Sequence, residues 1–544
     1  MDPVGIAGLT IAVLDQLWKI GNGTAELISN YRDFDNDTKA LEDKIRDENN
    51  RTKALRMLLL DPCSTYGGES LFEQFDVDVQ EQIHIFLEQA SDVLDQAHQL
   101  MHRRQRTEGY ESTHQLRLPL MTTKLPRSSV ASPTSYQSVS RRPRSLERIR
   151  WSLLDKKRVE TIVAEFSELN CRIHESIKLW CLGTSIGVDL RHLRHLEKNH
   201  NSQILGFDVD ARLQIATSQA AEHAMSLEVS RSVLSESSEI HRVGDKFGII
   251  RGDGQAVLLE YRSYSPEAPV PVELDDRTRD LIDKLANLLH QPKEIVFRTP
   301  NCVGWFREAK ENKVAYIFNV PEGFDPSPIS LLDVLKSKDL PAPSLSQRFW
   351  LALRLSKCIS QLQLVKWVHE SFRSENILFF PSMNKDQAGA SSAWVFDFSE
   401  PWVLGFEFSR PETYFSHGHA DTCLTRDVYR HPDRQQRPTQ LFSKIHDIYA
   451  LGVVLLEIGL WQPALSLDKD GFASAQNPQS IKKHLLRHAE KRLGVKMGTK
   501  YQGAVIKCLT GDFDVKDDNK EDLKLQQAFR SDVVDVLQRA ADSI

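Results

Sequence analysis

The apolar positions in the C-terminal half of the chain recur at helical spacing in two long segments. The first segment runs from Arg348 to Val368 and predicts one long helix. Its apolar band consists of Trp350, Leu351, Leu353, Leu355, Ile359, Leu362 and Leu364. The second segment, residues 274–290, predicts a shorter helix. The apolar face of that helix is expected to contain Leu281, Leu285 and Leu288.

Shorter apolar runs in the same half predict strands. Residues 247–262 form two such runs around Asp253 and Gly254, a dipeptide typical of a tight hairpin turn. A further strand is predicted over Val314–Pro321, and Ile329–Leu335 predicts a short helix. This half is therefore expected to have an α+β fold.

The N-terminal half starts with an apolar stretch from Val4 to Leu14, which is too short to span a bilayer by itself. Two interpretations stay open: a buried first helix, or a helix that is also released to bind a membrane surface. No basic segment precedes the stretch, so we do not expect a secretory signal. Residues 106–144 are rich in Ser, Thr, Pro and Arg, and they predict a disordered basic insert.

Length and charge narrow the class of protein. A chain of 544 residues exceeds what one compact core usually organises, which predicts two domains. The net charge of -6 argues against general nucleic-acid binding. Seven cysteines are scattered without a C-x-x-C pair, so neither a metal site nor a disulfide framework is expected. We therefore expect the protein to be in the cytoplasm, which is a reducing compartment.

The segment from His369 to Asn376 resembles the catalytic loop of protein kinases. In that loop, the pattern H-R-D-x-x-x-x-N carries a catalytic aspartate and a metal-binding asparagine. His369 and Asn376 match the pattern with Arg373 between them, whereas Ser371 occupies the place of the aspartate. A serine hydroxyl accepts no proton at neutral pH unless another base activates it. The resemblance therefore implies a loop that keeps its frame and lacks its catalytic residue.

Other segments similar to kinase motifs follow in the kinase order. Asp447 and Gly452 resemble the D-x-x-x-x-G start of the large buried helix of the kinase C-lobe, where the aspartate ties down the catalytic-loop backbone. The resemblance extends from about residue 240 to the C-terminus. It implies a bilobal fold with an N-lobe over residues 240–320 and a C-lobe over residues 321–544.

The nucleotide-binding motifs of kinases are degenerate in this sequence. No lysine occurs in the second strand of the hairpin, where a kinase carries its phosphate-binding lysine. Arg262 is the nearest cationic substitute, and its guanidinium suits bidentate contacts with phosphate. The helix predicted over residues 274–290 has no central glutamate that could pair with a lysine.

Two segments are possible counterparts of the metal-binding D-F-G motif. We favour Leu404–Glu407, in which Gly405 replaces the aspartate and Phe406 follows it. In the alternative, Asp397 fills that position and binds Mg²⁺ together with Asn376. ATP and Mg²⁺ are therefore possible ligands, and no cofactor is certain.

The N-terminal residues 1–15 resemble the opening of a HeLo domain, and residues 148–180 are similar to a later part of that domain. The resemblance implies an all-α helical bundle over residues 1–230, of the kind found in fungal prion-inhibition and heterokaryon-incompatibility proteins. In such proteins the first helix acts on membranes during programmed cell death. The corresponding effector residues here are Val4, Ile6, Leu9, Ile11, Val13 and Leu14.

Together the two resemblances imply a multidomain signalling protein, with a helical bundle followed by a kinase-like domain that is catalytically inactive. The kinase-like domain would act as a switch, and the bundle would self-associate at the plasma membrane. The expected partners are proteins. One alternative is an atypical kinase that uses Asp397 and Asn376 for the metal. A second alternative is a passive interaction scaffold.

Overall fold

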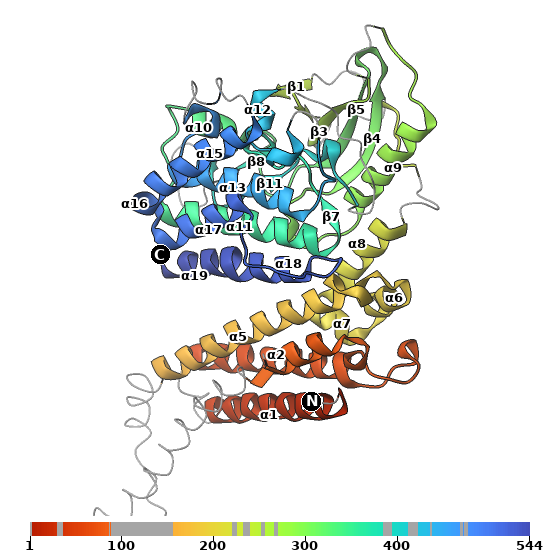
Figure 1. Cartoon of the computed structure of the whole chain (residues 1–544), viewed down its shortest axis with the longest axis vertical. Coiled ribbons are helices and arrows are strands. Elements are labelled where there is room, and N and C mark those ends of the chain that lie inside the picture. Colours follow the sequence, from red (N-terminus) through yellow and green to blue (C-terminus); the bar gives the residue numbers. More distant parts are fainter. Residues whose placement is uncertain are drawn as a thin grey trace, which may run out of the picture. The chain divides into compact units, whose positions relative to one another are not determined.

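The computed structural model of the whole chain is mostly helical with small antiparallel sheets (Figure 1). It describes residues 3–29, 36–85, 87–88, 156–219, 226–231, 240–251, 256–265, 270–383, 394–411, 423–435, 438–467, 472 and 477–544. The insert expected over residues 106–144 and the turn at Asp253 and Gly254 lie outside these residues.

Two compact units make up the chain. Unit 1 contains Met1–Lys178 and Asn199–Gly206, and unit 2 contains Leu179–Lys198 and Phe207–Ile544. The sequence led us to expect a single boundary between residues 230 and 240. The structure instead assigns residues 179–198 and 207–219 to the C-terminal unit. For example, the Thr217 hydroxyl and the backbone carbonyl of Val365 are 3.3 Å apart and hydrogen-bonded, although 148 residues separate them.

Unit 1 is helical in its described residues. Its principal helices are α1 (Pro3–Ser29), α2 (Asn36–Leu60), the first part of α5 (Lys156–Gly183) and α7 (His200–Leu205). Helix α1 packs along α2. Between α2 and α5, Asn170 donates a hydrogen bond to the Glu48 carboxylate (2.6 Å) and accepts one from the Thr52 hydroxyl (3.1 Å). These buried polar contacts define how the two helices pair, because a buried polar group is costly without a partner.

Unit 2 contains a five-stranded antiparallel sheet in the order β1-β2-β3-β5-β4. Its strands are β1 (Ile240–Val243), β2 (Phe247–Arg251), β3 (Ala256–Ser263), β4 (Cys302–Glu308) and β5 (Lys313–Asn319). Helix α9 (Asp276–His290) packs against β4. Successive residues of β3 point to opposite faces, so Leu258 joins the main core with Trp305, while Leu259 joins a smaller cluster with Ile317.

The remainder of unit 2 is largely helical. Its helices are α6 (Leu190–Lys198), α8 (Phe207–Gln219), α10 (Leu331–Lys336), α11 (Leu345–Leu364), α12 (Leu424–Asp427), α13 (Lys444–Leu460), α15 (Pro478–His488), α16 (Gly494–Met497), α17 (Thr499–Thr510), α18 (Leu523–Phe529) and α19 (Asp535–Ser543). Three small antiparallel sheets accompany them, in the orders β11-β8-β6, β10-β9 and β12-β7. Their strands are β6 (Ile329–Ser330), β7 (Trp367–Val368), β8 (Ile377–Phe379), β9 (Pro381–Met383), β10 (Trp394–Phe396), β11 (Trp402–Val403) and β12 (Arg410–Pro411).

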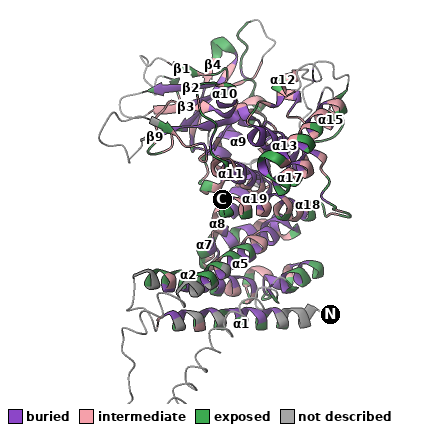
Figure 2. Ribbon diagram, turned by 90° about the vertical axis from the view of Figure 1, so that its left-hand side faces the viewer, coloured by how far each residue is buried: buried purple, intermediate pink, exposed green. Residues whose placement is uncertain are grey.

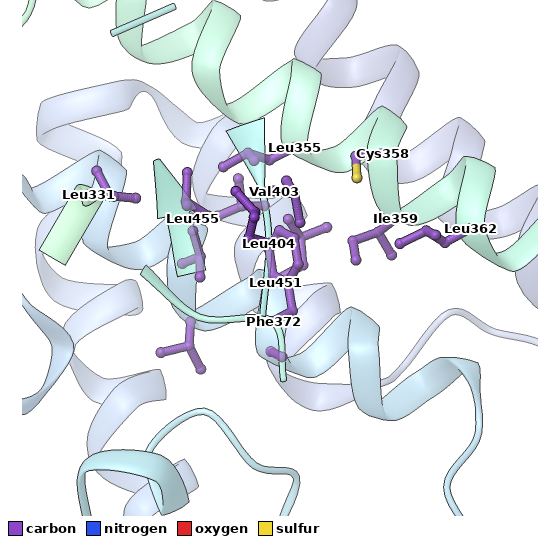
Figure 3. Close-up of a cluster of buried hydrophobic side chains, with 14 of the residues drawn as sticks. Leu331, Leu355, Cys358, Ile359, Leu362, Phe372, Val403, Leu404, Leu451 and Leu455 are labelled. Atoms are coloured by element: carbon purple, nitrogen blue, oxygen red, sulfur yellow. The ribbon is translucent and has the colours of Figure 1, made fainter. Parts of the chain in front are cut away.

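Helix α13 lies at the centre of this helical part and is buried along nearly its whole length (Figure 2). It packs between α11 and α17. Figure 3 shows Leu451 and Leu455 of α13 facing Leu355 and Ile359 of α11, with Leu404 between them. Between Ile448 and Ile458, Glu457 is the one charged residue, and a helix that is apolar on nearly all sides is expected at such a central position.

Several predicted elements occur with shifted ends. Helix α11 begins at Leu345 because Ser344 and Gln347 form a capping box, and it ends at Leu364. The predicted helix continued to Val368, which instead belongs to β7. In α9, Leu285 and Leu288 are buried as expected, but Leu281 is 42% exposed.

The structure assigns a 27-residue helix, α1, to the apolar N-terminal stretch. Among the described residues, no helix combines the length and the apolar character that crossing a membrane requires. Of the expected effector residues, Val13 and Leu14 are buried and Ile11 is 37% exposed. The side chains of Val4, Ile6 and Leu9 lie outside the described set.

Candidate functional site

The candidate site is built around the loop that connects β7 to β8, and Asp447 at the start of α13 holds this loop in place. The Asp447 carboxylate accepts hydrogen bonds from the backbone N–H groups of His369 (2.8 Å) and Glu370 (3.1 Å). Burial raises the pKa of Asp447 to about 7, although both N–H groups act in the opposite direction. The loop backbone is thus tied to the buried helix α13.

The imidazole of His369 has a packing role. Its Nδ1 accepts the N–H of Ser371 at 3.3 Å, so the ring proton is on Nε2, which donates to the Leu404 carbonyl at 3.1 Å. The ring lies 4.8 Å from the ring of Phe406, centroid to centroid. Because the side chain is fully buried, its pKa is lowered to about 3. His369 is therefore neutral and joins the loop to the Leu404–Glu407 segment.

Ser371 and Asn376 are bonded to each other. The Asn376 amide donates to the carbonyl of Ser371 (2.7 Å) and to its hydroxyl (3.2 Å). Asn376 Oδ1 is buried and has no hydrogen-bond partner among the described residues. The side chain that would serve as a metal ligand in a kinase loop instead closes the loop on itself.

Gly405 lies directly against Asn376. Its φ of +88° is in the left-handed region, where glycine is favoured. A Cβ atom added at this position would be 2.0 Å from Asn376 Nδ2. The space that an aspartate side chain would need here is therefore filled by Asn376.

The backbone N–H of Gly405 donates to the carboxylate of Glu260, at 3.0 Å. Glu260 is on β3 and is only 1% exposed. Burial raises its pKa to about 7, which the Gly405 hydrogen bond partly opposes. Its second oxygen has no hydrogen-bond partner among the described residues. An acid that is partly protonated near neutral pH thus lies beside the Leu404–Glu407 segment.

An ion-pair network lies next to this acid. Lys246, in the turn between β1 and β2, pairs with Glu407. Arg373 also contacts Glu407, at 3.4 Å, and it pairs with Glu375 at 3.1 Å. Burial lowers the pKa of Lys246, while Glu407 raises it. The two cations are therefore engaged by carboxylates of the protein.

Arg262 and Asp397, the candidate nucleotide and metal residues, have neighbours other than Asn376. Arg262 is partly buried. Burial raises the pKa of the Tyr316 hydroxyl to about 12, although the positive charge of Arg262 acts in the opposite direction. Asp397 accepts hydrogen bonds from the N–H (2.8 Å) and hydroxyl (2.7 Å) of Ser399, which forms a local turn. Neither residue has a contact with Asn376 among the interactions of the described residues.

A match to a known protein family lies within unit 2. A family model described as a domain of unknown function (DUF7580) covers residues 318–544. The match begins at the end of β5 and includes the loop, Gly405 and Asp447, but neither Glu260 nor Lys246. No curated protein matches the chain.

Sequence reasoning missed three participants in this site. Glu260 is the single charged residue in the run Val257–Tyr261, and a charge inside an otherwise apolar strand was an available signal. Lys246 had no such signal, because it reaches Glu407 across 161 residues of sequence. Glu407 lay within the Leu404–Glu407 segment, but nothing in that segment indicated its ion pairs. Gly452, which we did predict, lets α13 approach α17, since a Cβ there would be 2.8 Å from the Cβ of Cys508.

Proposed function

We propose that unit 2 is a kinase-like domain without catalytic activity, and that it acts as a binding switch on an N-terminal helical unit of the HeLo type. The supporting features occur in the order expected of a kinase-like domain: a five-stranded sheet with one packed helix, a loop from His369 to Asn376, and a buried helix beginning near Asp447. The aspartate of the buried helix bonds the loop backbone, as that resemblance implies.

The contact between Glu260 and Gly405 is the observation that carries the proposal. Glu260 places a carboxylate on the strand where a kinase has its phosphate-binding lysine. A carboxylate beside nucleotide phosphates is repulsive whenever it is ionised, and it supplies no positive charge when it is protonated. With Gly405 at the position of the usual aspartate ligand for Mg²⁺, that ligand is also missing, and Asn376 fills the space that a side chain there would need. Ser371 then removes the catalytic base.

Helix α1 supplies the element that the switch would act on. Its buried side chains include Leu14 and Leu17, while Ile11 and Trp18 are exposed. In the proposal, a ligand that prefers one state of unit 2 shifts the population toward a state in which α1 is released and the helical units associate at a membrane surface. Membrane contact by α1 would be interfacial, at the cytoplasmic face of the plasma membrane.

A thermal-shift titration of the full chain with ATP, with and without Mg²⁺, tests the loss of nucleotide chemistry. A ligand that binds only the folded state raises the melting temperature. We expect no Mg²⁺-dependent rise at millimolar ATP, and no transfer of labelled phosphate to a protein substrate. A Mg²⁺-dependent rise together with label transfer would overturn the proposal and favour an atypical kinase.

A deletion tests the effector role of α1. Removal of residues 4–14 should abolish any toxicity that overexpression causes, while unit 2 keeps its unfolding transition. A matched control, Q16A, changes an exposed polar residue of α1 outside the deleted stretch and should keep the toxicity. Toxicity that persists in the deletion variant, at equal protein level, would contradict the proposed effector role.

A further inference from the structure

A cavity lies on the side of the catalytic-like loop formed by Glu370 and Ser371. It encloses about 440 Å³ of space free of protein atoms, part of which is open to solvent. Its other walls include Arg426, Arg430 and Arg434. None of these arginines was singled out by the sequence patterns.

The cavity carries an excess of positive charge. Arg430 has an ion pair with Asp427 at 3.3 Å, but Arg434 has no ion pair with any residue that the structure describes. Arg434 donates to the Gln440 carbonyl at 2.6 Å and stacks over Phe442, 5.6 Å from the ring centroid. Burial lowers the pKa of Arg434, the carboxylate of Glu370 raises it, and the nearby cations Arg410 and Arg430 lower it by repulsion. An anion placed here would relieve this repulsion.

Two acids also line the cavity, and both are held by partners in the protein. Glu370 pairs with Arg410, and Asp447 accepts the two loop N–H groups. At the third position of the loop, Ser371 replaces the aspartate of a kinase. That replacement removes a negative charge from the cavity wall.

His446 adds a neutral hydrogen-bond donor to the cavity wall. This side chain is 2% exposed, and its Nδ1 accepts the N–H of Ser443 at 2.9 Å. The ring proton is therefore on Nε2, which has no hydrogen-bond partner among the described residues. Burial lowers the pKa of His446 to about 3, so the ring stays neutral at physiological pH.

The same histidine argues against a cation. A ring nitrogen of His446, a ring nitrogen of His431 and a carboxylate oxygen of Asp433 lie within 4.8 Å of one another, as in a possible metal site. A metal would need a lone pair on His446, whereas Nδ1 already accepts a hydrogen bond and Nε2 carries the proton. Three neighbouring arginines repel a cation as well. The donors in this cavity suit an oxyanion.

We propose that this cavity binds a phosphate monoester, with Arg426, Arg430 and Arg434 as its charged contacts and His446 Nε2 as a neutral donor. A phosphate monoester carries nearly two negative charges at neutral pH and three terminal oxygens, so it satisfies several converging donors at once. A carboxylate has one charge and two oxygens, so it would satisfy fewer of these donors. The binding site is inferred from the residues of the cavity alone. Its use as the input of the switch rests on the proposed function.

Calorimetric titration of the full chain at constant ionic strength tests the site. The probes are inorganic phosphate, phenyl phosphate, and a short peptide with one phosphoserine beside its unphosphorylated form. We expect saturable binding of the phosphate-bearing probes and none of the unphosphorylated peptide. Phosphopeptide binding that is tighter than phenyl phosphate binding would identify a protein-borne phosphate as the source, and equal affinities would identify a small molecule.

Variants then locate the binding. R434Q and R426Q should each weaken phosphate binding roughly tenfold, the usual effect of one lost charged hydrogen bond. R191Q is the matched control, since the Arg191 side chain is 83% exposed and lies on α6. Two cavity variants are used so that a folding defect in one leaves the other informative.

Absence of saturable binding by the wild-type chain at millimolar phosphate would overturn the site. So would equal binding by the wild type and both cavity variants, because the anion would then bind elsewhere. Neither result affects the ATP titration, which tests loss of nucleotide chemistry separately. A Mg²⁺-dependent ATP shift, in turn, would leave the phosphate measurement unchanged.

Discussion

Glu260 and Gly405 are separated by 145 residues in the sequence and are joined by a hydrogen bond of 3.0 Å from the Gly405 N–H to the Glu260 carboxylate. The contact joins β3 of the sheet to the segment that precedes β12. In the proposed kinase-like domain, this acid occupies the strand that would carry the phosphate-binding cation. The consequences of this arrangement can be measured without any knowledge of the natural ligand.

The buried carboxyl of Glu260 should make stability depend on pH. Its pKa is about 7 in the folded chain, whereas the ordinary pKa of a glutamate exposed to solvent is 4.5, so its protonation favours folding. This contribution is fully present below pH 4.5 and is lost as the pH rises through 7. The free energy of unfolding of the wild type, relative to E260Q, should therefore fall by up to about 3 kcal/mol between these values.

Urea unfolding of the wild type and of E260Q at several pH values measures this difference in the free energy of unfolding. The comparison with E260Q is needed because Asp447 and Glu457, whose pKa values are also raised to about 7, contribute in the same window. E490Q serves as the control, since Glu490 is exposed. A wild-type-to-E260Q difference that is flat with pH would contradict the raised pKa of Glu260 in the folded chain.

Replacement of Gly405 by alanine should destabilise unit 2. The new Cβ would meet Asn376 Nδ2 at 2.0 Å, and φ of +88° is unfavourable for any side chain. The backbone strain alone costs about 1–2 kcal/mol, and the steric overlap adds to it. The double variant G405A/N376A should recover part of the loss, because the overlap is gone and the backbone strain is not. Thermal unfolding followed by circular dichroism measures both.

G503A is the matched control for that experiment. Gly503 lies in α17, and an added Cβ would meet nothing within 4 Å. Alanine is favoured over glycine inside a helix by about 0.5–1 kcal/mol, so this variant should be slightly more stable than the wild type. If G405A unfolded at the same temperature as G503A, the close approach of Gly405 and Asn376 would be disproved.

Asp447 should be essential for the loop. In the wild type, the backbone N–H groups of His369 and Glu370 each donate to one Asp447 oxygen. In D447N, one of these two N–H groups faces the amide NH₂, which is a donor and not an acceptor. A buried donor without a partner costs about 1–3 kcal/mol. Hydrogen exchange should also speed up at these two N–H groups. D280N is the control, because the Asp280 side chain is 55% exposed and its loss should cost less than about 1 kcal/mol.

Leu14 and Ile11 should differ in what they contribute to unit 1. Leu14 is fully buried, so L14A should reduce the free energy of unfolding by about 2–5 kcal/mol. Ile11 is 37% exposed, and I11A should change it by about 0.5 kcal/mol or less. Hydrogen exchange of the α1 amides distinguishes the two variants. Equal exchange in both would mean that Leu14 does not hold α1 in place.

Local patterns in the sequence determined much of the fold. The apolar spacing of residues 348–368 predicted α11, and the run after Asp447 predicted the buried helix α13, because helical periodicity depends only on neighbours three and four residues apart. The sequence alone also placed Ser371 where the resemblance to a kinase loop expects an aspartate. The ends of the elements do not follow from the apolar pattern alone, because a helix cap such as Ser344 also determines where a helix begins.

The tertiary structure decided what the site contains. Glu260 and Lys246 reach Gly405 and Glu407 from strands and turns more than 140 residues away, and no local pattern encodes such contacts. Contacts in the folded chain also decide the division into units. Residues 179–198 and 207–219 belong to unit 2, whereas residues 199–206 between them belong to unit 1. Burial depends on the whole fold, and it is the main cause that raises the pKa of Glu260 and lowers that of His446.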